Sequence, residues 1–241
     1  MTNILTANRL TKEFGRVRAL DDVSFHVEEG EVLGLIGPNG AGKTTLFNVI
    51  AGSSRIDKGT IKLDGEDITR KSPSTRCRLG IGRTYQVPRP FETLTVYENV
   101  LVSAVHGAGR NQKEARSEVR GILELSGLAH RKSHFAKDLN VLERKLLELA
   151  KVLGSNPRLL LLDEIAAGLT EVDFQQVLKI VGQLRGKGRT VIWVEHIPRL
   201  MTQGVDRLLV LAEGKILASG KPGEVMSTQQ VADVYLGRQQ E

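Results

Sequence analysis

A strand, a glycine-rich loop and a helix follow one another directly in the first quarter of the chain. Residues 37–44 read Gly-Pro-Asn-Gly-Ala-Gly-Lys-Thr, which fits the pattern G-x-x-x-x-G-K-[S/T]. The aliphatic run Val32 to Ile36 precedes the loop. After it, the segment Leu46 to Ile50 carries its apolar residues on one helical face, and Gly52 marks the end of the helix. This succession predicts an α/β fold in which the loop connects a buried strand to a helix.

The residue types in this loop suit the binding of a polyphosphate. Glycines let the backbone curl closely around an anion, so that several N–H groups converge on it, and the N-terminus of the following helix favours negative charge. Lys43 is predicted to reach the β- and γ-phosphates of a nucleotide, and the Thr44 hydroxyl to bind Mg²⁺. The alternative is a glycine turn that exposes a surface lysine, and the flanking strand and helix argue against it.

A second aliphatic strand ends in two adjacent carboxylates. Residues 158–164 read Arg-Leu-Leu-Leu-Leu-Asp-Glu, and ligands of open α/β sheets lie at the C-terminal ends of strands. Asp163 is therefore predicted to hold the Mg²⁺ shell, and Glu164 to act as the general base for an attacking water. The alternative is that Asp-Glu merely closes a strand at a turn. The phosphate loop makes that alternative less favourable.

The periodicity of the chain changes twice. The first part reads as strands, with alternation over Leu20 to Glu28 and a predicted edge strand and hairpin turn over Gly59 to Gly65. The middle, Asn111 to Leu153, follows a helical period with a stop at Gly127. The last third returns to strands and helices, namely a helix over Phe174 to Leu184, a strand over Thr190 to Glu195, and a short helix after Ser227. Such alternation predicts a mostly parallel sheet covered on both faces.

Composition and charge exclude several classes of protein. The chain has 241 residues, 40% of them hydrophobic, and a net charge of +6 from 34 basic and 28 acidic residues. The basic residues are scattered among acids without a block, which favours a solvated surface over a nucleic-acid partner and leaves open a basic face near an anionic membrane leaflet. The single cysteine, Cys77, forms no internal disulfide and suggests a reducing compartment. No signal peptide and no membrane-spanning segment are expected.

The order of these elements resembles the ATPases of ABC transporters. A helical segment separates Lys43 from Asp163, as in that family, and three further residues lie at matching places. The resemblance implies that Phe14 is the aromatic residue that stacks on adenine. It also implies that Gln86 contacts Mg²⁺ and the water, and that His196 contacts the γ-phosphate. By the same resemblance the catalytic residues are Glu164, His196 and Gln86, and the metal ligands are Thr44, Gln86 and Asp163. The nucleotide-binding set comprises Phe14, Gly37, Pro38, Asn39, Gly40, Ala41, Gly42, Lys43, Thr44 and Thr45.

The resemblance also implies a fold, a domain division and partners. The expected fold is an α/β P-loop NTPase (RecA-like) core with an N-terminal antiparallel β subdomain and an inserted α-helical subdomain. The expected bounds are 1–86 and 154–241 for the core, and 87–153 for the helices. Such a chain would bind ATP and Mg²⁺, and would work with transmembrane permease subunits and a second ATPase subunit on the cytoplasmic face of the cell membrane. A soluble ABC ATPase of DNA repair or translation and a non-catalytic ATP-binding subunit are the rival interpretations.

Three segments resemble the ATPase subunits of bacterial branched-chain amino acid importers. They are Gly80 to Gln86, the stretch from Pro90 to Val100, and the ending Ala232 to Gly237. An importer of this kind also works with an extracytoplasmic solute-binding protein. Nothing in these segments selects leucine over urea, an amide or another small solute.

The chain departs from the family in its signature segment. The family has a Ser-Gly-Gly loop that opens a helix and caps the ATP of the partner subunit, whereas residues 139–145 here read Leu-Asn-Val-Leu-Glu-Arg-Lys. Asn140 and Glu143 are spaced as a capping box, so the helix itself is well specified. Thr170 stands where the family usually has an aspartate. These departures predict an asymmetric dimer, in which the loop of this chain is capped by a different partner and the reciprocal site is weak. A homodimer is the alternative.

Overall fold

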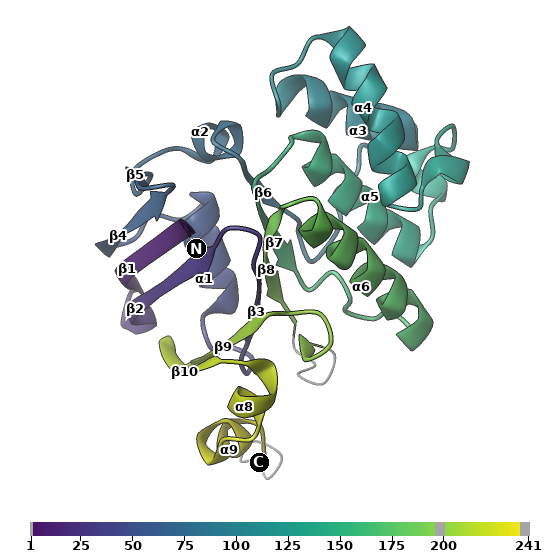
Figure 1. Cartoon of the computed structure of the whole chain (residues 1–241). Coiled ribbons are helices and arrows are strands. Elements are labelled where there is room, and N and C mark those ends of the chain that lie inside the picture. The colour runs from purple at the N-terminus through teal and green to yellow at the C-terminus, as the bar shows by residue number, and fades with distance from the viewer. Residues whose placement is uncertain (1, 196–200, 237–241) are drawn as a thin grey trace.

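Buried aliphatic strands build a six-stranded sheet in the order β10-β9-β3-β8-β7-β6 (Figure 1). The computed structural model describes residues 2–195 and 201–236. The strands are β3 (Val32–Ile36), β6 (Ile81–Arg83), β7 (Leu159–Asp163), β8 (Thr190–Val194), β9 (Arg207–Ala212) and β10 (Lys215–Gly220). Neighbouring strands are parallel, except that β10 pairs with β9 in the antiparallel sense. The mostly parallel sheet that the sequence predicts is therefore confirmed.

Strand periodicity divides the core into two layers. In β3 and β7 every residue is buried, and successive side chains point to opposite faces of the sheet. Leu33 and Leu161 pack in one layer with helix α1 (Lys43–Ala51) and the antiparallel sheet. Val32 and Leu160 pack in the other layer with the helices of the middle and last parts of the chain. Both faces are covered, which explains why these strands read as continuous aliphatic runs rather than alternating ones.

A four-stranded antiparallel sheet flanks this core in the order β2-β1-β4-β5. It consists of β1 (Asn3–Phe14), β2 (Val17–Glu28), β4 (Lys58–Leu63) and β5 (Glu66–Asp67). The strand and hairpin turn predicted over Gly59 to Gly65 are confirmed as β4 and its turn into β5. Only the edge position is wrong, because β4 pairs with β1 on one side and with the two-residue β5 on the other. The sequence did not predict β1. Register shifts between its residues interrupt the alternation that would reveal a strand.

Three helices of the middle part lie together on one side of the molecule (Figure 1). They are α3 (Val96–His106), α4 (Gln112–Leu125) and α5 (Val141–Gly154). The predicted capping box of α5 is confirmed, since the Asn140 side chain accepts from Glu143 N at 2.8 Å and Glu143 Oε2 accepts from Asn140 N at 3.0 Å. Sequence periodicity missed α3, which starts with a capping box of its own between Thr95 and Glu98.

The remaining helices cover the sheet or close the chain. The helix predicted over Phe174 to Leu184 is α6 (Glu171–Gly186), and the one predicted after Ser227 is α9 (Gln229–Leu236). Helices α2 (Pro73–Arg78) and α8 (Pro222–Met226), and two short 3-10 turns at Ala129–Arg131 and Ala136–Asp138, had no clear sequence pattern.

The expected fold class is confirmed: an α/β core with an N-terminal antiparallel sheet and inserted helices. Within the described residues, no helix has both the length and the apolar composition needed to cross a bilayer.

Candidate functional site

The phosphate loop connects β3 to α1 and lines a pocket of about 400 Å³. Two glycines are required by close backbone contacts. A Cβ on Gly37 would lie 2.1 Å from Leu211 O, and one on Gly42 would lie 2.4 Å from Ala19 O. Gly42 also has φ 106°, a left-handed conformation that L side chains avoid. The loop is therefore held against β2 and β9, while residues 39–45 face the pocket.

Lys43 lies at the start of α1, where its side chain returns over the loop. Its Nζ donates to Gly37 O at 2.6 Å and to Pro38 O at 3.0 Å. Burial lowers the pKa of Lys43, an effect that the nearby carboxylates of Glu164 and Asp163 oppose. An ammonium group on the floor of a pocket, beside the N-terminus of a helix, can bind the terminal phosphates of a nucleotide.

The structure brings Gln86 and Glu164 together although they are far apart in the sequence. Gln86 Nε2 donates to Glu164 Oε2 at 2.6 Å, and Glu164 lines the same pocket as Lys43. The Glu164 backbone has φ 46°, which is unusual for a residue other than glycine and typical of functional sites. A carboxylate oriented by an amide, beside a pocket with an ammonium group, is suited to accept a proton from a water that attacks a phosphate.

Asp163 forms a buried ion pair with a residue that the sequence had not singled out. Arg83 Nη2 donates to Asp163 Oδ2 at 2.9 Å, and the two side chains are only 8% and 7% exposed. The Asp163 backbone N also donates to Thr84 Oγ1 at 3.0 Å. Its position is thus fixed from two sides.

The oxygen donors at this place fit Mg²⁺. The exposed Thr44 hydroxyl lines the pocket, and the Asp163 carboxylate is near enough to act on the charge of Lys43, so both are hard oxygen ligands at the phosphate loop or near it. Among residues 2–195 and 201–236, no group of three His, Cys, Asp or Glu side chains could hold a metal ion by itself. Mg²⁺ in nucleotide sites is held by one or two protein oxygens together with phosphates. A site without three such side chains is therefore consistent with Mg²⁺ bound by Asp163, Thr44 and the nucleotide.

One predicted site residue, Phe14, is not part of this arrangement. Phe14 is 53% exposed at the end of β1, with Lys12 Nζ 5.1 Å from its ring centroid, and does not line the pocket. Val17 and Arg18, across the hairpin turn, do line it. His196 lies outside the described residues.

Sequence reasoning also missed residues that surround the pocket. Glu213 and Gly214, in the β9–β10 turn, line the pocket, and Gly214 N donates to Ala41 O at 3.0 Å. The Glu-Gly pair between two strands is a hairpin-turn signal that marks this place in the sequence. For Arg83 no sequence signal exists beyond its position in the segment Gly80 to Gln86.

A buried acid and a lysine hold the segment that follows Glu164. Lys145 Nζ, from α5, donates to Glu164 O at 3.3 Å and to Ala167 O. Glu195 Oε1 accepts from Ala166 N at 2.8 Å and from Trp193 Nε1 at 3.1 Å. Burial raises the pKa of Glu195 to about 7, and the Glu164 carboxylate adds to this, while the two hydrogen bonds and Lys145 oppose it. Glu195 therefore changes its protonation state near neutral pH.

This raised pKa predicts the pH dependence of folding stability. The folded protein binds the Glu195 proton up to about pH 7, whereas the unfolded chain releases it near 4.5. The penalty for the buried charge is therefore absent below pH 4.5, grows as the pH rises and is complete above 7. We expect Glu195→Gln to raise the free energy of unfolding at pH 8 by about 1–3 kcal/mol. At pH 5 the gain should be much smaller.

Chemical denaturation at pH 5, 6, 7 and 8 measures this difference. Glu124→Gln, at an exposed position of α4, is the matched control and should leave the profile unchanged. A gain from Glu195→Gln that is the same at all four pH values would contradict a carboxyl that titrates in this range.

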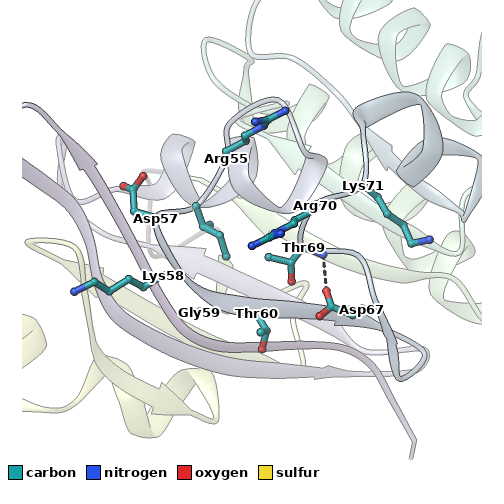
Figure 2. A pocket seen from close by; sticks show the side chains of 10 residues that line it. Arg55, Asp57, Lys58, Gly59, Thr60, Asp67, Thr69, Arg70 and Lys71 are labelled. Carbon is teal, nitrogen blue, oxygen red and sulfur yellow. Dashed lines mark hydrogen bonds between the residues drawn. The ribbon is translucent and has the colours of Figure 1, made fainter.

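A second cavity, of about 930 Å³, lies on the antiparallel sheet (Figure 2). Its lining includes Arg55, Lys58 and Arg70, but Arg55 and Lys58 point away from each other. Asp67 Oδ1 accepts from Thr69 N at 2.8 Å within the same wall. The cavity lacks the glycine loop and the buried lysine of the phosphate loop, so we place the chemistry at the smaller pocket over that loop.

Comparisons with known proteins agree with this assignment. The family model described as ABC transporter matches residues 20–167. The lipopolysaccharide export system ATP-binding protein LptB of Haemophilus influenzae is 36% identical over 237 residues, which are 98% of each chain. The probable branched-chain amino acid transport ATP-binding protein LivG of Archaeoglobus fulgidus is 35% identical, over 98% of this chain and 96% of LivG.

Solved structures show the same fold. The ADP conformation of an ATP-binding cassette of an ABC transporter has a TM-score of 0.91 at 33% identity, covering 98% of this chain and 100% of that one. A nucleotide-free cassette has a TM-score of 0.87 at 32% identity, over 97% and 99% of the two chains. The chain therefore belongs to the ABC transporter family and is an ATP-binding, ATP-hydrolysing subunit of such a transporter.

Proposed function

We propose that hydrolysis takes place at the pocket over the phosphate loop, with Glu164 as general base. The contact between Gln86 Nε2 and Glu164 Oε2, at the rim of the pocket that Lys43 lines, carries this proposal. The loop amides and Lys43 bind the phosphates, and Gln86 orients the carboxylate that accepts the proton of the attacking water. Phe14 and His196 keep the roles that the family resemblance implies, adenine stacking and contact with the γ-phosphate.

Mg²⁺ belongs to this proposal as the partner of the nucleotide. Asp163, Thr44 and Gln86 would hold it, and it would neutralise the charge that develops on the phosphate oxygens. The remaining work is done by the chain, which fixes the phosphates, places the carboxylate and closes the pocket.

A groove of about 500 Å³ provides a surface for the permease. It lies between α1, α2, β6, α3 and α5, and exposed apolar side chains stand on or beside the segment that follows Arg83. Tyr85 is 48%, Val87 70% and Phe91 50% exposed. We place a cytoplasmic element of the permease here, because this segment continues from Gln86. We keep the predicted division into residues 1–86, 87–153 and 154–241, whose first boundary lies in the segment that follows Arg83.

For the transported solute we propose import of branched-chain amino acids. The segments Gly80 to Gln86, Pro90 to Val100 and Ala232 to Gly237 favour it, and the LivG relatives support it. The system would then include a solute-binding protein outside the membrane, with this chain on the cytoplasmic face. Urea, amides or another small solute fit the same machinery. The similarity to LptB makes lipopolysaccharide export the second candidate.

Lys43→Ala tests the site and the solute together. Without the ammonium group, the affinity of the purified chain for MgATP should fall at least about 100-fold, since charged hydrogen bonds of this kind each contribute about 1.5–3 kcal/mol. In cells that depend on this chain, uptake of labelled leucine should be lost.

The matched control is Lys113→Ala, at an exposed position of α4. Retained MgATP affinity in Lys43→Ala would contradict the site. Normal leucine uptake together with lost lipopolysaccharide export would contradict the solute and favour the second candidate. Loss of neither transport would leave urea or amide uptake to be measured in the same cells.

A further inference from the structure

Arg83 occupies a buried position between the pocket and the permease groove. It ends β6, and its guanidinium donates from Nη2 to Asp163 Oδ2 at 2.9 Å and from Nη1 to Asn48 Oδ1 at 2.6 Å. Its Nε is buried and has no hydrogen-bond partner within the described residues. One side chain thus connects the strand end that carries Asp163 to helix α1, which begins at the phosphate loop.

Two aromatic rings hold the guanidinium from other directions. Its Cζ lies 5.7 Å from the ring centroid of Phe47, on α1, and 5.3 Å from that of Tyr85. Phe47 is fully buried, whereas Tyr85 is 48% exposed. Both Arg83 and Tyr85 line the groove that we assign to the permease. Arg83 therefore contacts Tyr85, which lines the groove, and Asp163, which is the predicted metal ligand.

Stability alone does not explain this arrangement. A buried ion pair loses about as much hydration energy as it recovers, and apolar residues of similar size often serve as well. What the pair provides is orientation, because a planar guanidinium fixed by Asn48 and two rings holds one carboxylate oxygen and leaves the other available.

We propose that Arg83 is a positioning residue that holds the Asp163 carboxylate for Mg²⁺ and links it to the permease groove through Tyr85. This inference rests on the proposed function, in which Asp163 binds the metal and the groove receives the permease. In this proposal Arg83 acts through Asp163 and Tyr85 and not on the nucleotide or the metal directly. A change in the groove that moves Tyr85 shifts the guanidinium, and with it the carboxylate.

The first test measures how much Mg²⁺ strengthens nucleotide binding by the purified chain. The affinity for ADP is titrated with and without Mg²⁺ in wild type, Arg83→Lys, Arg83→Met and, as a control, Arg116→Met at an exposed position of α4. Residues that orient metal ligands typically alter metal affinity by about 10–100-fold. We expect both Arg83 variants to reduce the Mg²⁺ enhancement at least about 10-fold. Methionine removes the charge, and lysine keeps it but cannot donate to both Asp163 and Asn48 as the planar guanidinium does.

ADP affinity without Mg²⁺ should change by less than about 2-fold, because Lys43 and the loop amides bind the phosphates. An enhancement that is unchanged in Arg83→Lys, or increased in it, would overturn the proposal, the latter because Arg83 would then compete with the metal. Arg83→Lys decides the matter even if Arg83→Met does not fold. Failure of the proposed function is separately visible, as retained ADP binding in Lys43→Ala.

The second test examines the link to the groove by a double-mutant cycle. Tyr85→Leu removes the exposed ring without touching Asp163, and cation–π contacts of this kind correspond to about 2–5-fold in an equilibrium constant. We expect it to reduce the Mg²⁺ enhancement by that factor in the wild-type background and not in Arg83→Met, which has no cation to contact the ring. The same reduction in both backgrounds, or none in either, would overturn the link while leaving the positioning role to the first test.

Discussion

Glu164→Gln is expected to lower kcat for ATP hydrolysis by about 10²–10⁴-fold, the usual contribution of a general base. The amide has the same shape as the carboxylate but cannot accept the proton of the attacking water. Its carbonyl oxygen can still accept the hydrogen bond that Gln86 Nε2 now donates to Glu164 Oε2 at 2.6 Å. The phosphate-binding groups, Lys43 and the loop amides, are untouched, so nucleotide affinity should stay within about 3-fold.

Single-turnover hydrolysis by the chain together with its permease and partner ATPase measures the effect. Glu171→Gln, an exposed acid in the first turn of α6, is the control and should leave kcat unchanged. If the chain were a non-catalytic subunit whose nucleotide only joins two proteins, Glu164→Gln and wild type would turn over ATP at the same rate. If the chain is catalytic and the variant still hydrolyses ATP at the wild-type rate, a group other than Glu164 must accept the proton.

The parts of this site that could be predicted are those encoded locally. The phosphate loop needs glycines at fixed places because the backbone approaches Leu211 and Ala19, so the requirement shows within eight consecutive residues. The Asp163–Glu164 pair could be placed because it ends an aliphatic run, and the ends of parallel strands meet at one edge of the sheet.

What could not be predicted depends on contacts between distant segments. The hydrogen bond between Gln86 and Glu164 joins two loops, and Gln86 was singled out only through the family resemblance. Arg83 is one arginine among many in the sequence, and its burial against Asp163 depends on the pairing of β6 with β7. Strand β1 was missed because register shifts break its alternation, and α3 because its capping box, not its apolar pattern, marks the start.

In the signature segment at the start of α5, the polar groups of Asn140 and Glu143 are hydrogen-bonded to each other. The Asn140 side chain accepts from Glu143 N, and Glu143 Oε2 accepts from Asn140 N. Burial acts to raise the pKa of Glu143, but the hydrogen bond from Asn140 N and the Arg131 guanidinium at 2.7 Å lower it overall. By the family resemblance this segment would cap the partner's ATP, so we expect the negative Glu143 carboxylate and the exposed Val141 side chain (63%) to disfavour a phosphate here.

We therefore expect this chain not to form an ATP-dependent homodimer at micromolar concentration, even as Glu164→Gln, which retains ATP. Replacing Asn140→Ser, Val141→Gly and Leu142→Gly in that background should strengthen ATP-dependent dimerisation at least about 100-fold. The basis is two restored charged hydrogen bonds, each of about 1.5–3 kcal/mol. Glycine at two helical positions costs about 1 kcal/mol each, so thermal melting must first show that the variant is folded.

Analytical ultracentrifugation with and without ATP measures the dimer, and Asn140→Ser alone is the control, because Val141 and Leu142 still block the approach. A different ATPase subunit that carries Ser-Gly-Gly should dimerise with the unmodified chain in the presence of ATP, since its signature caps the phosphate loop of this chain. An ATP-dependent homodimer of Glu164→Gln with its native signature segment would contradict the asymmetry, because Asn140 and the first turn of α5 would then suffice to bind the partner's nucleotide.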